Sequence, residues 1–160
     1  TGLPLTHVDS HQHMHMLPGV IDISLDVAAS LHLDAVRISR TPLFTAFAGM
    51  GQLIGRLGLF TLSELSLWKA KRRHFRVPDH FEGIVAGEAV HEGHFLHILK
   101  DLRPGTTEVM MHPGTDNSRL IPACDWEHDF EAEMQAIVSP KVRRMIADKA
   151  VKVVNYRDLK

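Results

Sequence analysis

A row of polar side chains at every second position near the start of the chain constrains its local structure most strongly. The row consists of His7, Asp9, His11, His13 and His15. Alternate residues of an extended strand point to one face, so an extended segment over 6–15 would project all five side chains together. Burying such a row without partners would cost several kcal/mol. The pattern therefore predicts a strand whose histidines bind a divalent cation or transfer protons.

The composition is that of an ordinary globular protein. The chain has 160 residues, 44% hydrophobic and 23% charged, which is enough for one domain with a core. Its formal net charge of −1 excludes a field that would attract nucleic acid or an anionic membrane surface. The single cysteine, Cys124, suits a reducing compartment and favours a cytoplasmic location. We expect no transmembrane segment, because no apolar stretch has the length of one.

Short β-rich runs alternate with helical segments along the chain. Strands are predicted at 5–10, 35–39, 81–85, 106–111 and 151–156. Helices are predicted at 18–31, 90–102, 125–138 and 140–149, and the apolar, glycine-containing segment 43–67 is predicted to form a packed or lid-like helix pair. This order indicates an α/β fold with mainly parallel strands.

Several predicted strands end in residues that carry chemistry. These residues are His11 for the first strand, Arg37 and Arg40 for the second, and His112 for the strand at 106–111. Ligands bind at the C-terminal ends of parallel strands in α/β folds. The three strand ends are therefore predicted to meet at one site.

The alternating run His11, His13 and His15 is the strongest candidate for a metal site, because imidazole nitrogen binds zinc and similar cations well. The alternative is a surface cluster without a ligand, and the spacing does not tell which histidine binds. Asp9 is interpreted as a ligand or as an acceptor that orients an imidazole. Its alternative role is that of a turn or cap residue.

Four other residues are candidates for the site. His112 precedes Pro113 and is either a general acid or base or a hydrogen-bonded loop histidine. Arg37 either holds a catalytic carboxylate or binds substrate oxygen atoms, or forms a surface ion pair. Asp79 and His80 follow a proline and either face the substrate or form a capped turn.

Two segments resemble the motifs of a known family. Residues 6–19 closely resemble the central motif of the YdjC-like carbohydrate deacetylases, and residues 108–114 resemble their C-terminal motif. Residues 36–37 and 156–159 also fit, and the similarity runs in order along nearly the whole chain. The stretch 79–83 is most similar to the branch associated with hopanoid biosynthesis.

The resemblance implies a metal-dependent hydrolase of carbohydrate metabolism that removes acetyl groups from N-acetylated sugars or glycolipids, with magnesium or zinc as its cation. The implied fold is the C-terminal portion of a distorted, incomplete (β/α) barrel with mainly parallel strands. His11 then corresponds to a metal ligand, and His112 to an active-site histidine that protonates the leaving amine. His13 and His15 fall at histidine positions near the site, and Gln12 replaces a histidine often seen there.

This sequence begins after two other motifs of the family. Family members start with Asn-Ala-Asp-Asp-Phe-Gly, which supplies a metal-binding aspartate and the catalytic base, and a second metal-binding histidine follows. We therefore expect residues 1–160 to form a single partial domain, the C-terminal half of the barrel with the N-terminal half absent. The segment alone should bind metal weakly, show negligible deacetylase activity and self-associate through exposed apolar surface. The alternative is a non-catalytic module that binds a sugar or a metal.

Overall fold

The computed structural model describes residues 4–40, 50–84 and 89–159, without the side chains of 50–56. The chain divides into two compact units. The first contains Thr1–Phe81 and Val154–Lys160, and the second contains Glu82–Val153. The described residues form an α/β fold that is rich in helix and has a small parallel sheet. Each unit is described by itself.

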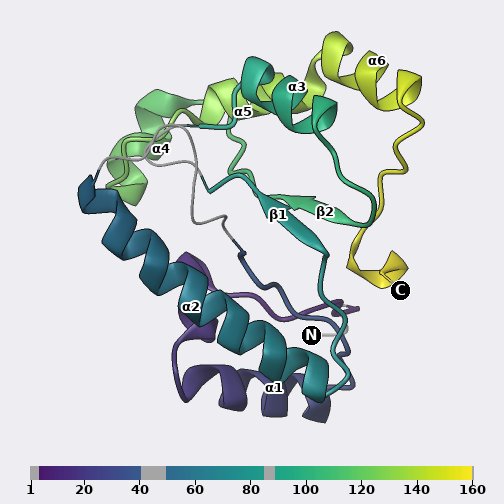
Figure 1. Ribbon diagram of the computed structural model, residues 1–160. Helices are drawn as coiled ribbons and strands as arrows, with labels where there is room; N and C mark the ends of the chain where they lie inside the picture. The colour runs from purple at the N-terminus through teal and green to yellow at the C-terminus, as the bar shows by residue number, and fades with distance from the viewer. Residues whose placement is uncertain (1–3, 41–49, 85–88, 160) are drawn as a thin grey trace. The chain divides into compact units, whose positions relative to one another are not determined.

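The first unit contains the histidine run, two helices and three parallel backbone segments. Residues His11–Met16 form the 3-10 helix η1, Val20–Ser30 form α1 and Met50–Arg72 form α2. Helices α1 and α2 lie side by side and both contact η1 (Figure 1). Parallel bridges join Val8 to Val36 and Ala35 to Arg76. A short 3-10 helix at Tyr156–Asp158, η2, closes the unit.

The core of the first unit forms between α1, α2 and the bridged segments. Its buried members are Met16, Ile21, Leu25, Ala28, Val36, Ile38, Ala70 and Phe75. From α1 it takes Ile21, Leu25 and Ala28, which recur every three or four residues as a helix face requires. A second apolar row runs along the same helix to the residue that caps its end, is exposed to 40–64%, and consists of Val20, Ile23, Val27 and the capping Leu31. The predicted helix is therefore confirmed, but its most regular apolar row faces away from the core.

The predicted strand over the histidine run is wrong. Gln12 and His13 have φ angles of 51° and 58°, and η1 replaces the extended backbone. The cause is local, because the Ser10 hydroxyl accepts the His15 backbone N–H at 2.8 Å and the Ser10 carbonyl accepts that of His13. Such local hydrogen bonds compete with a sheet ladder. The alternating side chains consequently do not share one face.

The other strands predicted in the first unit are shorter than expected or absent. Residues 35 and 36 make only the isolated bridges described above. Residues 151–155 have no regular structure, so the predicted closing strand is wrong. Part of the predicted helix pair at 43–67 lies outside the described residues, and its described part belongs to one helix, α2.

The second unit contains helices, one short strand and the last residue of another. Strand β2, Thr107–Val109, lies within the strand predicted at 106–111. Strand β1, His80–Glu82, begins one residue before the strand predicted at 81–85, and β1 and β2 form a two-stranded parallel sheet. Just after β1, Gly83 has a φ of 99°, and a Cβ there would collide with the Met110 carbonyl oxygen. Glycine is required at this position because the neighbouring backbone approaches so closely.

Four helices complete the second unit. They are α3, Glu92–Lys100, α4, Asn117–Cys124, α5, Phe130–Val138, and α6, Pro140–Asp148. Helix α3 packs against α5 and α6 (Figure 1). The predicted helices at 90–102 and 140–149 are confirmed. The one predicted at 125–138 begins later, because the Asp129 side chain caps it by accepting the Ala132 N–H. Helix α4 was not predicted.

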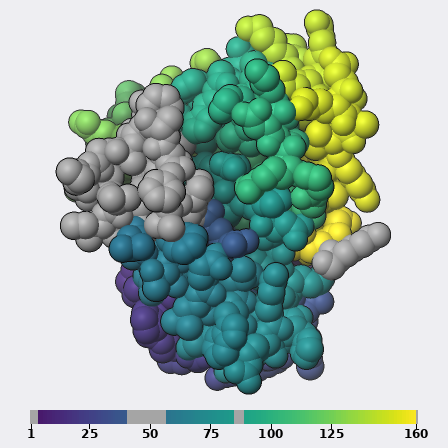
Figure 2. Space-filling model, viewed as in Figure 1, coloured from purple at the N-terminus to yellow at the C-terminus, as the bar shows by residue number. Residues whose placement is uncertain are grey.

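The longest described helix lies on the surface of its unit. Figure 2 shows α2, in blue and teal, exposed on the viewed face. Its described side chains include exposed Leu57 and Trp68, and Lys69, which pairs with Asp22 at 2.6 Å. Within 4–40, 50–84 and 89–159, no helix combines the length and the apolar character that crossing a membrane requires.

Candidate functional site

Two histidines and a buried glutamate gather in the second unit. His112 follows β2, His128 precedes α5, and Glu133 lies on α5. One nitrogen or oxygen atom from each lies within 4.8 Å of the others. These three residues are called the His112 cluster. Two imidazoles and a carboxylate are donor types that zinc and similar cations accept, but both carboxylate oxygens already accept backbone N–H groups.

Glu133 is the most deeply buried member of the cluster, with 1% of its surface exposed. Its Oε1 accepts the backbone N–H of Val90 at 2.8 Å, and its Oε2 accepts the backbone N–H of His112. A buried carboxylate is costly unless it is hydrogen bonded or paired. The two backbone donors meet this requirement, one on each oxygen.

His128 is held between aromatic rings beside that carboxylate. Its ring stacks on Trp126, with centroids 4.1 Å apart, and meets Phe130 at 4.9 Å with the rings inclined by 71°. Its Nε2 is buried and lies 3.3 Å from Glu133 Oε1, but it makes no hydrogen bond within the described part of the chain. The His112 ring contacts Trp126 and His128 edge-on, at centroid distances of 5.0 and 5.5 Å. The aromatic contacts thus connect His112 to the rest of the cluster.

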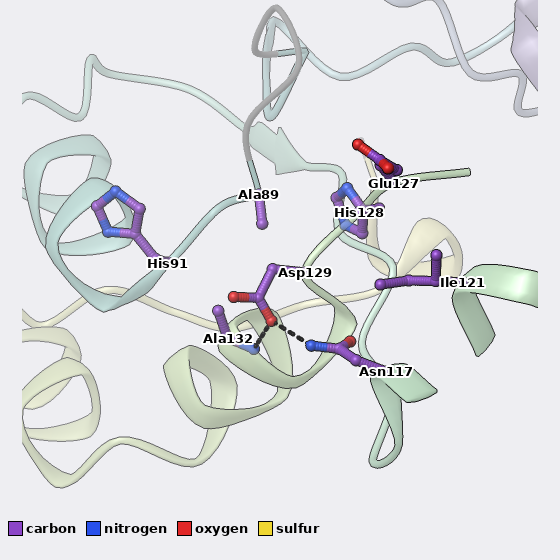
Figure 3. A pocket seen from close by; sticks show the side chains of 8 residues that line it. All are labelled: Ala89, His91, Asn117, Ile121, Glu127, His128, Asp129 and Ala132. Carbon is purple, nitrogen blue, oxygen red and sulfur yellow. Dashed lines mark hydrogen bonds between the residues drawn. The ribbon is translucent and has the colours of Figure 1, made fainter. Parts of the chain in front are cut away.

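An open pocket of about 650 Å³ lies on one side of the cluster (Figure 3). Its lining residues are Ala89, His91, Asn117, Ile121, Glu127, His128, Asp129 and Ala132. Asp129 Oδ1 accepts hydrogen bonds from the Asn117 side-chain amide at 2.8 Å and from the Ala132 backbone N–H at 2.9 Å. The hydrogen bond from Asn117, and to a lesser extent the one from Ala132, lowers the pKa of Asp129 below its ordinary 3.8. The pocket wall therefore carries an ionised hydrogen-bond acceptor at neutral pH.

Asp9 and Arg37, both predicted as site residues, form an ion pair with each other in the first unit. The Asp9 side chain also accepts the Ser10 backbone N–H at 2.7 Å. Both side chains are partly exposed, at 29% for Asp9 and 20% for Arg37. The pair matches the alternative predicted for Arg37, an ion pair near the surface, whereas a role toward a catalytic carboxylate or substrate oxygen atoms stays a prediction.

His13 and His15 are engaged within the protein. His15 is buried, and its Nδ1 lies 2.8 Å from the Ser10 hydroxyl while its Nε2 lies 2.7 Å from the Arg37 carbonyl oxygen. The carbonyl can only accept, so Nε2 carries the proton and Nδ1 accepts the Ser10 hydroxyl. Both nitrogens of His15 are thus occupied and neither is open to a metal. His13 Nδ1 is hydrogen bonded to the Ser39 hydroxyl at 2.8 Å.

His11, the predicted metal ligand, is exposed, and its imidazole has no partner among the described residues. Its nitrogens are therefore open to a ligand. His80 begins β1, and the backbone carbonyl of Asp79 lies 3.5 Å from the Arg40 guanidinium. His11 belongs to the first unit and His112 to the second, so their meeting at one site stays a prediction.

The sequence reasoning missed His128 and Glu133 as partners of His112. A helix at 125–138 is predicted from the sequence, but that prediction assigns no site role to its residues. A signal was present, since Glu133 lies three residues from Phe130 and three from Ala136, both of which are buried. A carboxylate on the apolar face of a short helix needs buried donors, and this spacing could have identified it.

Comparisons with known proteins agree with the motifs. The profile of the family described as YdjC-like protein matches residues 1–148. A carbohydrate deacetylase of Thermoanaerobacter pseudethanolicus is 27% identical over 159 residues, which cover 99% of this chain and 54% of that protein. Carbohydrate deacetylases of Mus musculus and Homo sapiens are each 28% identical, over 96% of this chain and 55% and 53% of their own lengths.

The match has two further features. The chain spans about half the length of the curated relatives it matches. No solved structure gives a significant match. The family profile, however, matches residues 1–148 and so covers far more than half of the chain. The chain therefore belongs to the YdjC-like protein family.

Proposed function

We propose that this chain forms part of a carbohydrate N-deacetylase, which removes acetyl groups from N-acetylated sugars or glycolipids by amide hydrolysis. One observation carries the proposal. His112, which occupies the histidine position of the C-terminal motif, contacts His128, and His128 lines the open pocket. The three relatives described above are named carbohydrate deacetylases, which supports the choice of reaction.

The reaction assigns a task to His112. Hydrolysis of an acetamide breaks its C–N bond, places the oxygen of water in the released acetate and leaves an amine that must gain a proton. An imidazole exchanges protons near neutral pH and is suited to give that proton to the departing nitrogen. On the pocket wall, the Asp129 carboxylate would accept hydrogen bonds from sugar hydroxyls, and the Asn117 amide would donate to them.

We propose magnesium or zinc as the cofactor, with His11 as one of its ligands. The exposed imidazole of His11 fits this role because it has no competing partner among the described residues. When bound, such a cation lowers the pKa of a coordinated water and polarises the acetyl carbonyl. Catalytic metal sites usually have three protein ligands, so we expect this chain alone to bind the cation weakly and to turn over little substrate. Asp9, His13, His15 and Arg37 would then support the backbone around His11.

We also propose that the fold is part of a distorted, incomplete (β/α) barrel. The parallel bridges from Val8 to Val36 and from Ala35 to Arg76 support this proposal, as does the parallel pair β1 and β2. Parallel segments separated by helices are the repeating element of such barrels.

A chimera tests the proposed activity. This chain would replace the matching 54% of the Thermoanaerobacter pseudethanolicus deacetylase, and acetate release from N-acetylglucosamine oligomers and from an N-acetylglucosamine glycolipid would be measured. We expect turnover by the chimera, and a loss of kcat of about 10²- to 10⁴-fold in His112→Gln, the usual contribution of a general acid. His97→Gln, on the exposed face of α3, is the matched control. A folded chimera that binds these substrates without releasing acetate would contradict the proposal.

A sugar-binding module without catalysis is the second candidate. The pocket favours it, because its volume and its mixture of Asn117, Asp129 and apolar side chains suit a small polar ligand. Calorimetric binding of N-acetylglucosamine oligomers that Asp129→Ala weakens, together with an inactive chimera, would support this candidate instead.

A further inference from the structure

We propose that Glu133 is a positioning residue, whose buried carboxylate fixes the backbone at His112 and thereby sets the direction of the His112 imidazole. The proposal rests on the proposed function for the role of His112, but its structural content concerns the backbone. Glu133 Oε2 accepts the N–H of His112 itself, one peptide group away from the side chain that would do the chemistry.

The carboxylate joins three separate segments of the second unit. Oε1 holds the N–H of Val90, a fully buried residue ahead of α3, while Oε2 holds the N–H of His112 after β2, and Glu133 itself lies on α5. Holding the amide nitrogen restricts φ at His112 and hence the direction of its Cα–Cβ bond. The chain on the carboxyl side is confined as well, because a Cβ on Gly114 would collide with the Leu120 and Phe130 side chains.

The burial of Glu133 indicates that its role is specific. The buried face of α5 consists of Phe130, Glu133 and Ala136, and Glu133 is the charged residue among them. An apolar residue of similar volume would avoid the cost of desolvating a carboxylate. Such a residue would, however, leave the Val90 and His112 N–H groups without this acceptor, and unpaired buried donors cost about 1–3 kcal/mol each. The glutamate is retained where two backbone donors converge.

His128 completes the arrangement from the other side. Its Nε2 lies 3.3 Å from Oε1, and its ring is fixed by Trp126 and Phe130. The His112 ring meets Trp126 and His128 edge-on. Backbone restraint by Glu133 and ring contact by Trp126 therefore act on the same imidazole.

The test is a nuclear magnetic resonance comparison of the whole chain with Glu133→Gln. The amide side chain keeps the shape of the carboxylate but loses one acceptor, so one backbone N–H loses its partner. We expect hydrogen exchange at His112 or Val90 to accelerate at least about tenfold, the change for about 1.4 kcal/mol of lost protection. We also expect the nuclear Overhauser contacts between the His112 and Trp126 rings to disappear.

Glu131→Gln is the matched control. Glu131 lies on the same helix, and its Oε1 also accepts a backbone N–H, that of Asn117 at 3.1 Å. We expect this variant to leave the His112 amide and ring signals unchanged. If Glu133→Gln does not fold, hydrogen exchange is measured on the unaltered chain instead, and the proposal requires both the His112 and the Val90 amides to be protected. Fast exchange at both amides would overturn the proposal.

Two further measurements separate this proposal from its competitors. When zinc chloride is titrated into the chain, we expect the resonances of the His112 and His128 rings not to shift. Saturable shifts of both would show that the cluster is a metal site and would overturn a positioning role. In the chimera, Glu133→Gln should lower kcat by about 10²-fold, the cost of a catalytic group misplaced by about 1 Å, with little change in KM. An inactive chimera would contradict the proposed function but leave the resonance result to stand by itself.

Discussion

At the scale of single residues, the histidine run shows how identical side chains take different roles. His15 is buried with both nitrogens hydrogen bonded, His13 bonds to Ser39, and His11 is exposed without a partner among the described residues. The difference arises from η1, because its left-handed residues turn successive side chains in different directions. Histidine spacing alone therefore overstates how many of these imidazoles are open to a cation.

Replacing His15 should destabilise the protein far more than replacing His11. His15→Ala removes the imidazole that the Ser10 hydroxyl and the Arg37 carbonyl contact and creates a cavity, so we expect a loss of about 2–4 kcal/mol in the free energy of unfolding. His11→Ala should change it by less than about 0.5 kcal/mol, as an exposed residue. Urea unfolding followed by circular dichroism measures both, and equal effects would contradict the hydrogen bonds assigned to His15.

At the scale of elements, most helices could be predicted from the sequence, whereas among the predicted strands only those at 81–85 and 106–111 correspond to strands of the structure. Pro140 follows Ser139, whose hydroxyl accepts the N–H groups of Lys141 and Val142, so the start of α6 is a local property. Helix α4 was missed because Pro122 lies inside it, although Asp116 caps it by accepting the Arg119 N–H. The strand predicted over the histidine run failed because the Ser10 hydrogen bonds are local too and favour a turn.

In the candidate site, one residue could be identified from the sequence and its partners could not. His112 was identified from its motif, since it follows a β-rich run and precedes Pro113. Its partners Glu133 and His128 lie 21 and 16 positions further along the chain, and their approach depends on how α5 packs rather than on any local pattern. Spacing can place Glu133 on the inner face of α5, but it does not identify His112 as the residue that Glu133 contacts.

Helix α1 gives a direct test of which apolar row is the inner one. Leu25 is fully buried whereas Ile23 is 64% exposed. We expect Leu25→Ala to lower the free energy of unfolding by about 2–5 kcal/mol, since it removes buried methyl groups and leaves a cavity. Ile23→Ala should change it by less than about 0.5 kcal/mol. Guanidinium unfolding of both variants measures the difference, and the reverse order would show that the helix packs through its other row.

At the scale of the whole molecule, acid should weaken both units. Hydrogen bonding and charge from Arg76 lower the pKa of Asp34 in the first unit, below its ordinary 3.8. In the second unit, a hydrogen bond from Ser139 and a weaker effect of one from Lys141 lower the pKa of Glu92 below its ordinary 4.5. A carboxyl whose pKa is lowered by folding stabilises the protein above its unfolded pKa, and this contribution is lost as the pH falls through the folded pKa.

The acid effect should be detectable as a difference between variants. The free energy of unfolding of the unaltered chain should exceed that of Asp34→Asn at pH 7, by less than about 1 kcal/mol because the pair is largely exposed. The excess should vanish as the pH falls below 3.8, where the carboxyl of the unaltered chain also becomes neutral. Urea titrations at pH 7, 5, 4 and 3 measure it, and an excess that grows on acidification would show that the pKa shift has the opposite sign.

The exposed row on α1 should also govern association of the whole chain. Four apolar side chains that recur along one helix, Val20, Ile23, Val27 and Leu31, are each at least 40% exposed. Contiguous exposed apolar surface promotes association between copies. We expect light scattering to give a mass that rises with protein concentration, and Ile23→Lys to reduce that rise by placing a charge in the row.

The control for this expectation is another exposed apolar residue outside the row. Val153, 75% exposed, follows α6 rather than lying on α1, and Val153→Lys changes the net charge by the same amount as Ile23→Lys. Because the charge is matched, a fall in association caused only by Ile23→Lys must arise from α1. A monomeric mass at every concentration would contradict the role of the row, whereas equal effects of both variants would attribute the association to general electrostatics rather than to this helix face.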